Sequence, residues 1–92
     1  MAISLYKPTP GETHAFRTKE VGGVNQEWYM WAGKGTRTTD PRWKIVKMEY
    51  DGSNNWTEKY PKDPVTGVGS DAPKFKLSEY DTYTYVLLGT SE

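Results

Sequence analysis

Glycine and proline divide this chain into short segments, and that division limits the possible folds more than any other feature of the sequence. Nine glycines and six prolines are spread over 92 residues. No window repeats apolar residues with the spacing of a helix face for more than one turn. Short apolar runs between turn-forming residues are typical of strands. We therefore expect an all-β chain.

The apolar residues are mainly aromatic, with four Trp, seven Tyr and two Phe. Each ring can bury on the order of 150 to 250 Å², and the polar tips of Trp and Tyr also suit contacts with proteins or sugars. The length leaves room for one domain, because two would each be too short to hold a core. We expect residues 1–92 to form one small antiparallel β-sandwich or partly open barrel of about five to seven short strands.

Six segments carry strand patterns. The apolar positions of the third change side between Ile45 and Val46, which predicts either a bulge or a strand that packs on both faces. Asp51 to Asn55 are turn formers and predict a tight hairpin. The expected strands are 12–19, 26–32, 42–50, 56–60, 74–77 and 82–88.

Two segments are expected to lie outside the regular strands. Residues 1–11 contain Pro8 and Pro10, which favour extended backbone, so they are predicted to form an N-terminal arm. Residues 61–73 form a loop rich in proline and glycine, longer than a compact domain normally carries. We interpret this loop as a contact loop.

The residues needed for most enzyme chemistry are missing. The chain has no cysteine, which excludes disulfides, thiolate zinc sites and cysteine nucleophiles, and His14 is its only histidine. The oxygens of Asp51 to Asn55 resemble the start of a calcium loop, but Trp56 replaces the required glycine and Lys62 the final glutamate. We expect no catalysis, no cofactor and no bound metal.

Charge and hydropathy limit the partners and the location. No apolar run approaches the roughly 20 residues of a membrane helix, and the first residues lack the pattern of a secretory signal. The formal net charge is zero, whereas nucleic-acid modules usually carry a basic excess. We expect synthesis in the cytoplasm, no membrane partner, and nucleic acid as an unlikely partner.

A pattern in the last two thirds of the chain resembles a known group of proteins. The stretch from Tyr29 to Asp51 joins Ala32-Gly33, a threonine-rich loop, Trp43-Lys44-Ile45 and Tyr50-Asp51, and Thr82-Tyr83-Thr84-Tyr85 follows later. This pattern resembles small virion-associated structural proteins of tailed bacteriophages. The resemblance implies a place in the virion and supplies no catalytic residues.

The leading hypothesis is a structural or accessory protein of a bacteriophage virion. It would bind capsid or tail subunits, as a capsid decoration or cement protein or as a head, neck or tail accessory, in several copies or as a homo-oligomer. Aromatic and basic side chains are the leading contact residues, with core packing as the alternative role of each ring. They are Trp28, Tyr29, Trp31, Arg37, Arg42, Trp43, Trp56 and Tyr60.

Two other functions remain open from the sequence. A carbohydrate-binding module for host-surface attachment would stack sugars on Trp28, Trp31, Trp56 and Tyr60, helped by Asn54 and Asn55. A single-stranded nucleic-acid binder would use Trp43 among the basic residues Lys34, Arg37, Arg42, Lys44 and Lys47.

Overall fold

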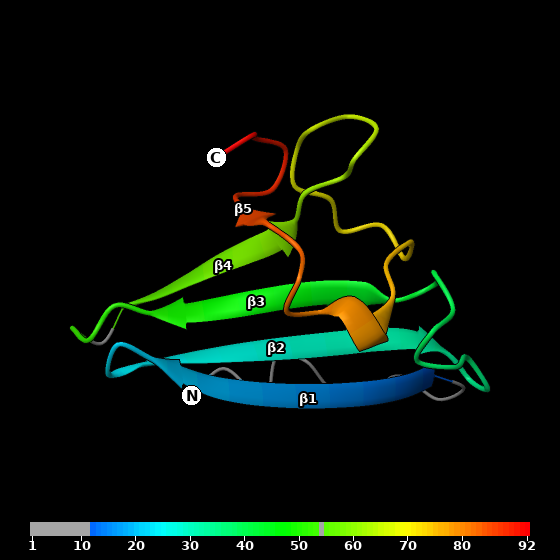
Figure 1. The fold of residues 1–92 in the computed structure, drawn as a ribbon, viewed down its shortest axis with the longest axis horizontal. Coiled ribbons are helices and arrows are strands. Elements are labelled where there is room, and N and C mark those ends of the chain that lie inside the picture. The colour runs from blue at the N-terminus through cyan, green and yellow to red at the C-terminus, as the bar shows by residue number, and fades with distance from the viewer. Residues whose placement is uncertain (1–11, 54) are drawn as a thin grey trace.

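Five strands form one antiparallel sheet, in which each strand pairs with the next in the sequence (Figure 1). The computed structural model describes residues 12–53 and 55–92, so the predicted arm lies outside the described residues. The strands are β1 (Glu12–Val21), β2 (Val24–Gly33), β3 (Lys44–Tyr50), β4 (Trp56–Pro61) and β5 (Tyr85–Val86). This confirms the expected all-β antiparallel domain, with a sheet that stays open.

The first hairpin turns through two glycines. Val21 pairs with Val24, and the residues between them, Gly22 and Gly23, have φ angles of 61° and 81°. Two positive φ values define the turn whose twist matches that of the flanking strands, and glycine adopts them without a steric cost. The ten pairs from Glu12–Gly33 to Val21–Val24 then follow without interruption.

The sheet has a core on each face. Neighbouring side chains of a strand point to opposite faces, so the uninterrupted apolar run in β2 is buried on both sides. The front core, on the side facing the viewer in Figure 1, consists of Trp28, Met30, Ala32, Trp43, Ile45, Phe75 and Leu77. The back core consists of Tyr29, Val46 and Met48, with Trp31, Trp56 and Tyr60 packed against it.

β3 is a strand that packs on both faces. Its pairing with β2 runs one to one from Gln26–Glu49 to Trp31–Lys44. Ile45 belongs to the front core and Val46 to the back core. Over these pairs the change of side predicted at Ile45 and Val46 therefore reflects burial on both faces and not a bulge.

The C-terminal segment, residues 74–88, covers the front core (Figure 1). Trp43 and Phe75 exchange backbone hydrogen bonds of 2.9 and 3.1 Å, and the short helix η2 (Leu77–Glu79) follows. The ring of Tyr80 meets that of Trp28 edge-on, with centroids 5.2 Å apart. This segment forms the second layer, where a sandwich would have a second sheet.

Two strand predictions in this segment need correction. Residues 74–77 make only an isolated bridge and the start of η2, and of residues 82–88 only β5 is a strand. The Tyr83 hydroxyl accepts a hydrogen bond from the Lys76 backbone N–H, at 2.9 Å, and the Tyr85 hydroxyl donates to the Tyr80 carbonyl. The alternating aromatic residues thus pack onto the front core and tie the segment to itself, which leaves only two residues paired with β4.

Candidate interaction site

Three of the predicted contact residues belong to the cores. Trp28, Tyr29 and Trp43 are only 3%, 1% and 3% exposed. A buried ring cannot meet a partner while the domain stays folded, so the alternative role, core packing, applies to these three. The indole N–H of Trp43 donates to the Arg37 carbonyl at 2.9 Å and so fixes the loop before β3. This placement removes Trp43 as a base-stacking residue and Trp28 as a sugar-stacking residue.

The other three aromatic contact candidates share the back face. Trp31, Trp56 and Tyr60 are half-buried and pack against the back core. The Trp56 ring lies 5.1 Å from that of Tyr50, and the Lys44 Nζ lies 5.5 Å from the ring centroid of Trp31. Each of these rings thus already has neighbours within the domain.

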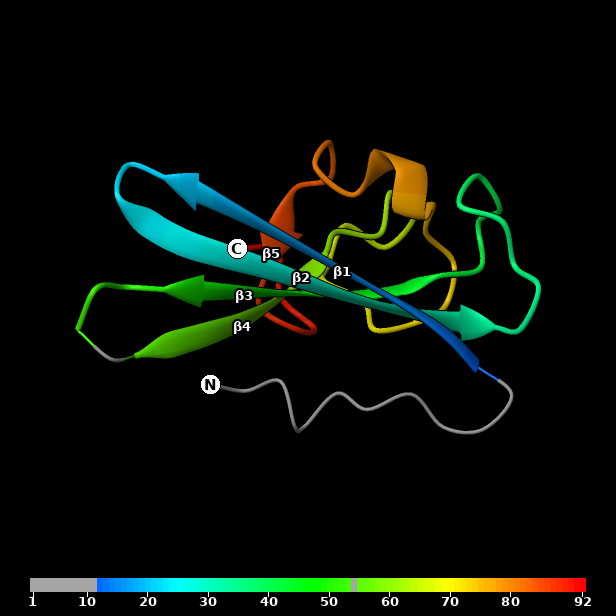
Figure 2. The same cartoon turned by 90° about the horizontal axis from the view of Figure 1, so that it is seen from below.

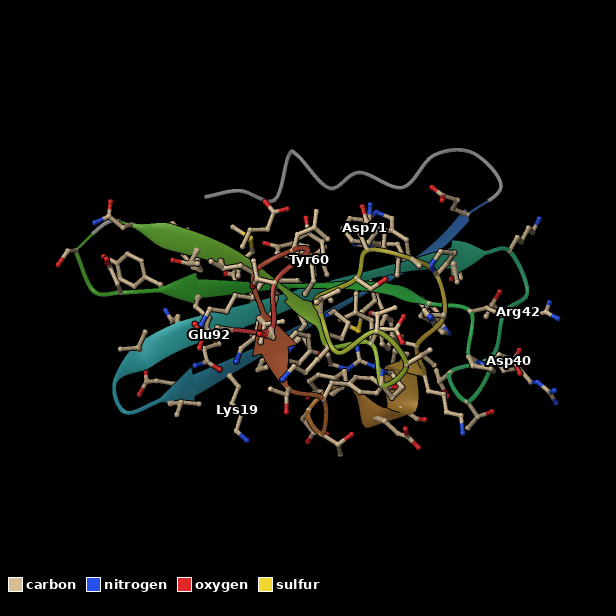
Figure 3. All side chains as sticks on the ribbon, turned by 90° about the horizontal axis from the view of Figure 1, so that it is seen from above. Lys19, Asp40, Arg42, Tyr60, Asp71 and Glu92 are labelled. Atoms are coloured by element: carbon tan, nitrogen blue, oxygen red, sulfur yellow. The ribbon has the colours of Figure 1, made fainter. Side chains whose placement is uncertain are left out.

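The two arginine candidates lie in the loop between β2 and β3, at one end of the sheet (Figure 3). Arg37 pairs with Asp40 at 3.5 Å, and its backbone N–H donates to the same carboxylate at 2.9 Å. That backbone hydrogen bond, helped by the guanidinium charge, lowers the pKa of Asp40. Arg42 is exposed.

The basic cluster predicted around Trp43 is divided by the sheet. Lys44 lies on the back face, whereas Lys47, three residues on, lies on the front beside Trp28. Lys47 also pairs with Glu49 at 2.9 Å. The cluster therefore does not form one continuous basic surface.

The loop 61–73 is built around one buried carboxylate. Asp63 is 4% exposed, and its side chain accepts hydrogen bonds from the Val65 backbone N–H at 2.8 Å and from the Lys74 ammonium. Its carbonyl accepts a hydrogen bond from the Gly67 N–H at 2.7 Å, and its N–H donates to the Val68 carbonyl at 2.8 Å, across the loop. The Lys74 hydrogen bond and then that of Val65 lower the pKa of Asp63. The predicted contact loop is thus held in one shape.

Gly69 connects this loop to the C-terminal residues. It forms an isolated β-bridge with Leu88. Its N–H donates to the Thr90 carbonyl at 2.8 Å, and its carbonyl accepts from the Gly89 N–H at 3.0 Å. A Cβ at this position would lie 2.6 Å from the Leu87 carbonyl oxygen, so only glycine fits. Figure 1 shows the loop and the C-terminus side by side beyond β5.

Three exposed apolar side chains lie in these joined segments. Val65, in the loop, is 86% exposed, and Leu87 and Leu88 are 45% and 49% exposed. We call the loop 61–73 together with residues 87–90 the C-terminal rim. The sequence pointed to the loop as a contact but not to these three side chains, because Val65 stands alone among polar residues and Leu87 and Leu88 lie in the stretch predicted as a strand.

The side chains considered for catalysis or metal binding lie at the surface or in a turn. His14 is exposed, with its ring 6.2 Å from that of Trp31. Within residues 12–53 and 55–92, no three His, Asp or Glu side chains gather as metal ligands. The Asp51 carboxylate accepts from the backbone N–H groups of Ser53 and Asn55, at 2.8 and 3.3 Å, as a turn residue does. Asn54 lies outside the described residues.

Comparisons with known proteins point to no function for this chain. The described part of the chain contains no helix long and apolar enough to cross a membrane. No protein-family model matches the chain, and neither a curated protein nor a solved structure matches it.

Proposed function

We propose that this chain is a structural protein of a bacteriophage particle and that it binds other particle subunits through the C-terminal rim. One observation carries the binding proposal: three apolar side chains, Val65, Leu87 and Leu88, are exposed on two segments that the hydrogen bonds of Asp63 and Gly69 hold together. Exposed apolar side chains on an ordered loop are suited to contact another protein.

The fixed loop favours binding for an energetic reason. A loop that must become ordered on binding costs roughly 0.5 to 1.5 kcal/mol for each side chain that it immobilises. Here the hydrogen bonds of Asp63 and the bridge at Gly69 order the loop before a partner arrives. Val65, Leu87 and Leu88 can then fill an apolar depression in the partner with little further ordering.

The particle context rests on the resemblance carried by Tyr29 to Asp51 and Thr82 to Tyr85. A small domain with an ordered apolar rim suits a decoration or cement protein, or a head, neck or tail accessory. In each of these roles the partner is a capsid or tail subunit. Binding through a rim needs no catalytic residue, cofactor or metal.

A co-sedimentation experiment tests this proposal. Particles assembled without the chain are mixed with the purified protein and centrifuged, and the bound protein is quantified. Val65→Asp should lower particle binding at least tenfold, because a charge would enter the apolar contact. The matched control is Thr57→Asp, which adds the same charge at an exposed position of β4 outside the rim and should bind like the wild type. Equal binding of wild type and Val65→Asp would contradict the role of the rim.

A further inference from the structure

The β1 edge of the sheet, opposite the β5 edge beside the C-terminal rim, offers a second surface for binding. β1 is the edge strand, and among the described residues its pairing partner is β2 alone. Figure 2 views the molecule from this edge. An edge strand offers a row of backbone N–H and C=O groups to any strand that comes alongside.

The hairpin turn fixes which groups of β1 face outward. Val21 and Val24 close a two-residue turn, so they form a hydrogen-bonded pair. Pairs alternate along an antiparallel ladder, so the odd-numbered residues of β1 bond to β2 and the even-numbered ones point their backbone groups away from it. The outward residues after Glu12 are His14, Phe16, Thr18 and Glu20.

A side-chain contact agrees with this assignment. The Arg17 guanidinium donates to the Phe16 carbonyl at 2.8 Å, on the exposed surface of the strand. A carbonyl that already bonded to β2 would be less accessible to this guanidinium. Because a carbonyl oxygen has two lone pairs, Phe16 can keep this contact and still accept a bond from another strand.

β1 lacks three of the features by which natural proteins protect an edge strand: short length, proline and a bulge. Such edges are usually short, interrupted by proline or bent by a bulge. β1 has ten residues without a proline, and its pairing with β2 is one to one throughout. Its charged residues are Glu12, Arg17, Lys19 and Glu20, and the Arg17 guanidinium is held on the Phe16 carbonyl. The stretch from Thr13 to Phe16 contains no acidic or basic residue other than His14.

We propose that β1 pairs antiparallel with β1 of a second copy of this chain, with the two Phe16 residues opposite each other on the two-fold axis. This pairing joins two five-stranded sheets into one continuous sheet. The axis is perpendicular to the sheet, so the two back faces, each carrying Phe16 and Tyr29, lie on the same side. It places the outward backbone groups of the two strands opposite one another, as hydrogen-bonded pairs.

Charge selects this register over those centred nearer the hairpin, and the Phe16 pair distinguishes it from a register centred on Ala15, which would place Phe16 opposite His14. Centring the axis on Arg17 would place two guanidinium groups opposite each other, and centring it on Thr18 would place Arg17 opposite Lys19. Directly opposed like charges destabilise a ladder, whereas opposed aromatic rings stabilise it. The proposed register pairs Phe16 with Phe16, Ala15 with Arg17, His14 with Thr18, Thr13 with Lys19 and, at the solvated ends, Glu12 with Glu20.

The packing of Phe16 on Tyr29, on the back face, supports the same register. Phe16 is 37% exposed, and its ring lies 5.1 Å from that of Tyr29 at an angle of 58°. In the dimer the two Phe16 rings meet across the axis, each still backed by its own Tyr29. The row of Phe16 and Tyr29 rings then continues from one sheet into the next, and the exposed part of Phe16 becomes buried.

Disulfide trapping tests the proposed register, because the chain has no cysteine of its own. A mixture of His14→Cys and Thr18→Cys chains should form a mixed disulfide dimer on mild oxidation, since these positions are opposite. Neither variant alone should cross-link. The matched control is Thr57→Cys, exposed on β4. Cross-linking of Arg17→Cys or of Thr18→Cys with itself, in place of the mixture, would overturn the register.

Sedimentation of the unmodified protein tests the self-pairing. We expect a dimer at tens of micromolar. Thr18→Pro should be a monomer, because it removes an outward N–H that β2 does not use, whereas Thr18→Ala should remain a dimer. A wild-type monomer at every concentration would overturn the proposal. A monomer that still binds particles would leave the proposed function intact, and a dimer that does not bind particles would refute that function alone.

Discussion

Trp28 and Tyr29 are neighbours in the chain, yet they are buried in different cores on opposite faces of the sheet. This relationship explains how a domain of 92 residues uses so many aromatic residues. An open sheet with apolar residues on one face has one core, whereas this sheet has two. The contacts proposed above use the β1 edge and the C-terminal rim, which lie outside both cores.

Replacing Tyr29 with phenylalanine should destabilise the domain. The Tyr29 hydroxyl donates to the Glu27 carboxylate at 2.7 Å, and Glu27 is only 7% exposed. Tyr29→Phe removes a donor from a buried carboxylate, which costs roughly 1 to 3 kcal/mol. Urea unfolding measures this loss. The matched control is Tyr60→Phe, whose hydroxyl meets the exposed Glu58, with an expected change within about 0.5 kcal/mol. Equal losses in both variants would contradict the buried role of Glu27.

Alanine at position 69 should disrupt the C-terminal rim. Its Cβ would lie 2.6 Å from the Leu87 carbonyl and 3.1 Å from a methyl of Val86, so the backbone would have to shift. Overpacking of this kind costs roughly 1 to 3 kcal/mol. The control is Gly33→Ala, where the nearest atom is 3.9 Å away and stability should be nearly unchanged. Thermal unfolding compares the two, and a Gly69→Ala variant as stable as Gly33→Ala would show that the close approach to Leu87 is wrong.

Acid should weaken the loop 61–73 through Asp63. The hydrogen bond from Lys74 and that from the Val65 N–H lower the pKa of Asp63 below its ordinary value of 3.8. A lowered pKa means that the folded state favours the charged carboxylate. This stabilisation is complete above the pKa of the unfolded chain and is lost as the pH falls through that of the folded chain.

The comparison with Asp63→Asn makes that effect measurable. The variant should be less stable than the wild type at pH 7, and the difference in unfolding free energy should shrink between about pH 5 and pH 2. Lys74→Met should show the same trend, because it removes the first cause of the lowered pKa. Wild-type and Asp63→Asn curves that stay parallel over this range would contradict the assigned ion pair.

Tryptophan quenching separates core rings from accessible ones. Trp28 and Trp43 are buried, whereas Trp31 and Trp56 are half-buried on the back face. Replacing Trp31 or Trp56 with phenylalanine should reduce the fraction of fluorescence that acrylamide quenches. Trp43→Phe should leave the quenchable emission unchanged. The opposite result, with Trp43 supplying most of it, would make this residue a contact candidate again.

Four of the five strands could be predicted from the sequence because their signals are local. Gly22-Gly23 and the turn formers after Tyr50 mark the ends of the hairpins, and the dense apolar run of β2 indicates burial on both faces. The β5 region shows the limit of such reasoning. Its alternating tyrosines predict a long strand, but tertiary packing of those rings onto Trp28 and Phe75 determines the local structure.

The interaction residues were harder to predict than the fold. A tryptophan in a strand has the same sequence signal in a core as at an interface, so Trp28 and Trp43 could not be separated from Trp31 and Trp56. The rim depends on Asp63 meeting Lys74, eleven residues away, and on Gly69 meeting Leu88. Such contacts follow from the folded chain and not from any local pattern.

The most direct test of the proposed particle role is quantitative mass spectrometry of gradient-purified phage particles produced by the source of this chain. The proposed structural role predicts that the chain is present in a fixed ratio to the major capsid or tail subunit, and that this ratio survives a second gradient. A chain that is abundant in the infected-cell lysate but absent from the purified particles would contradict it.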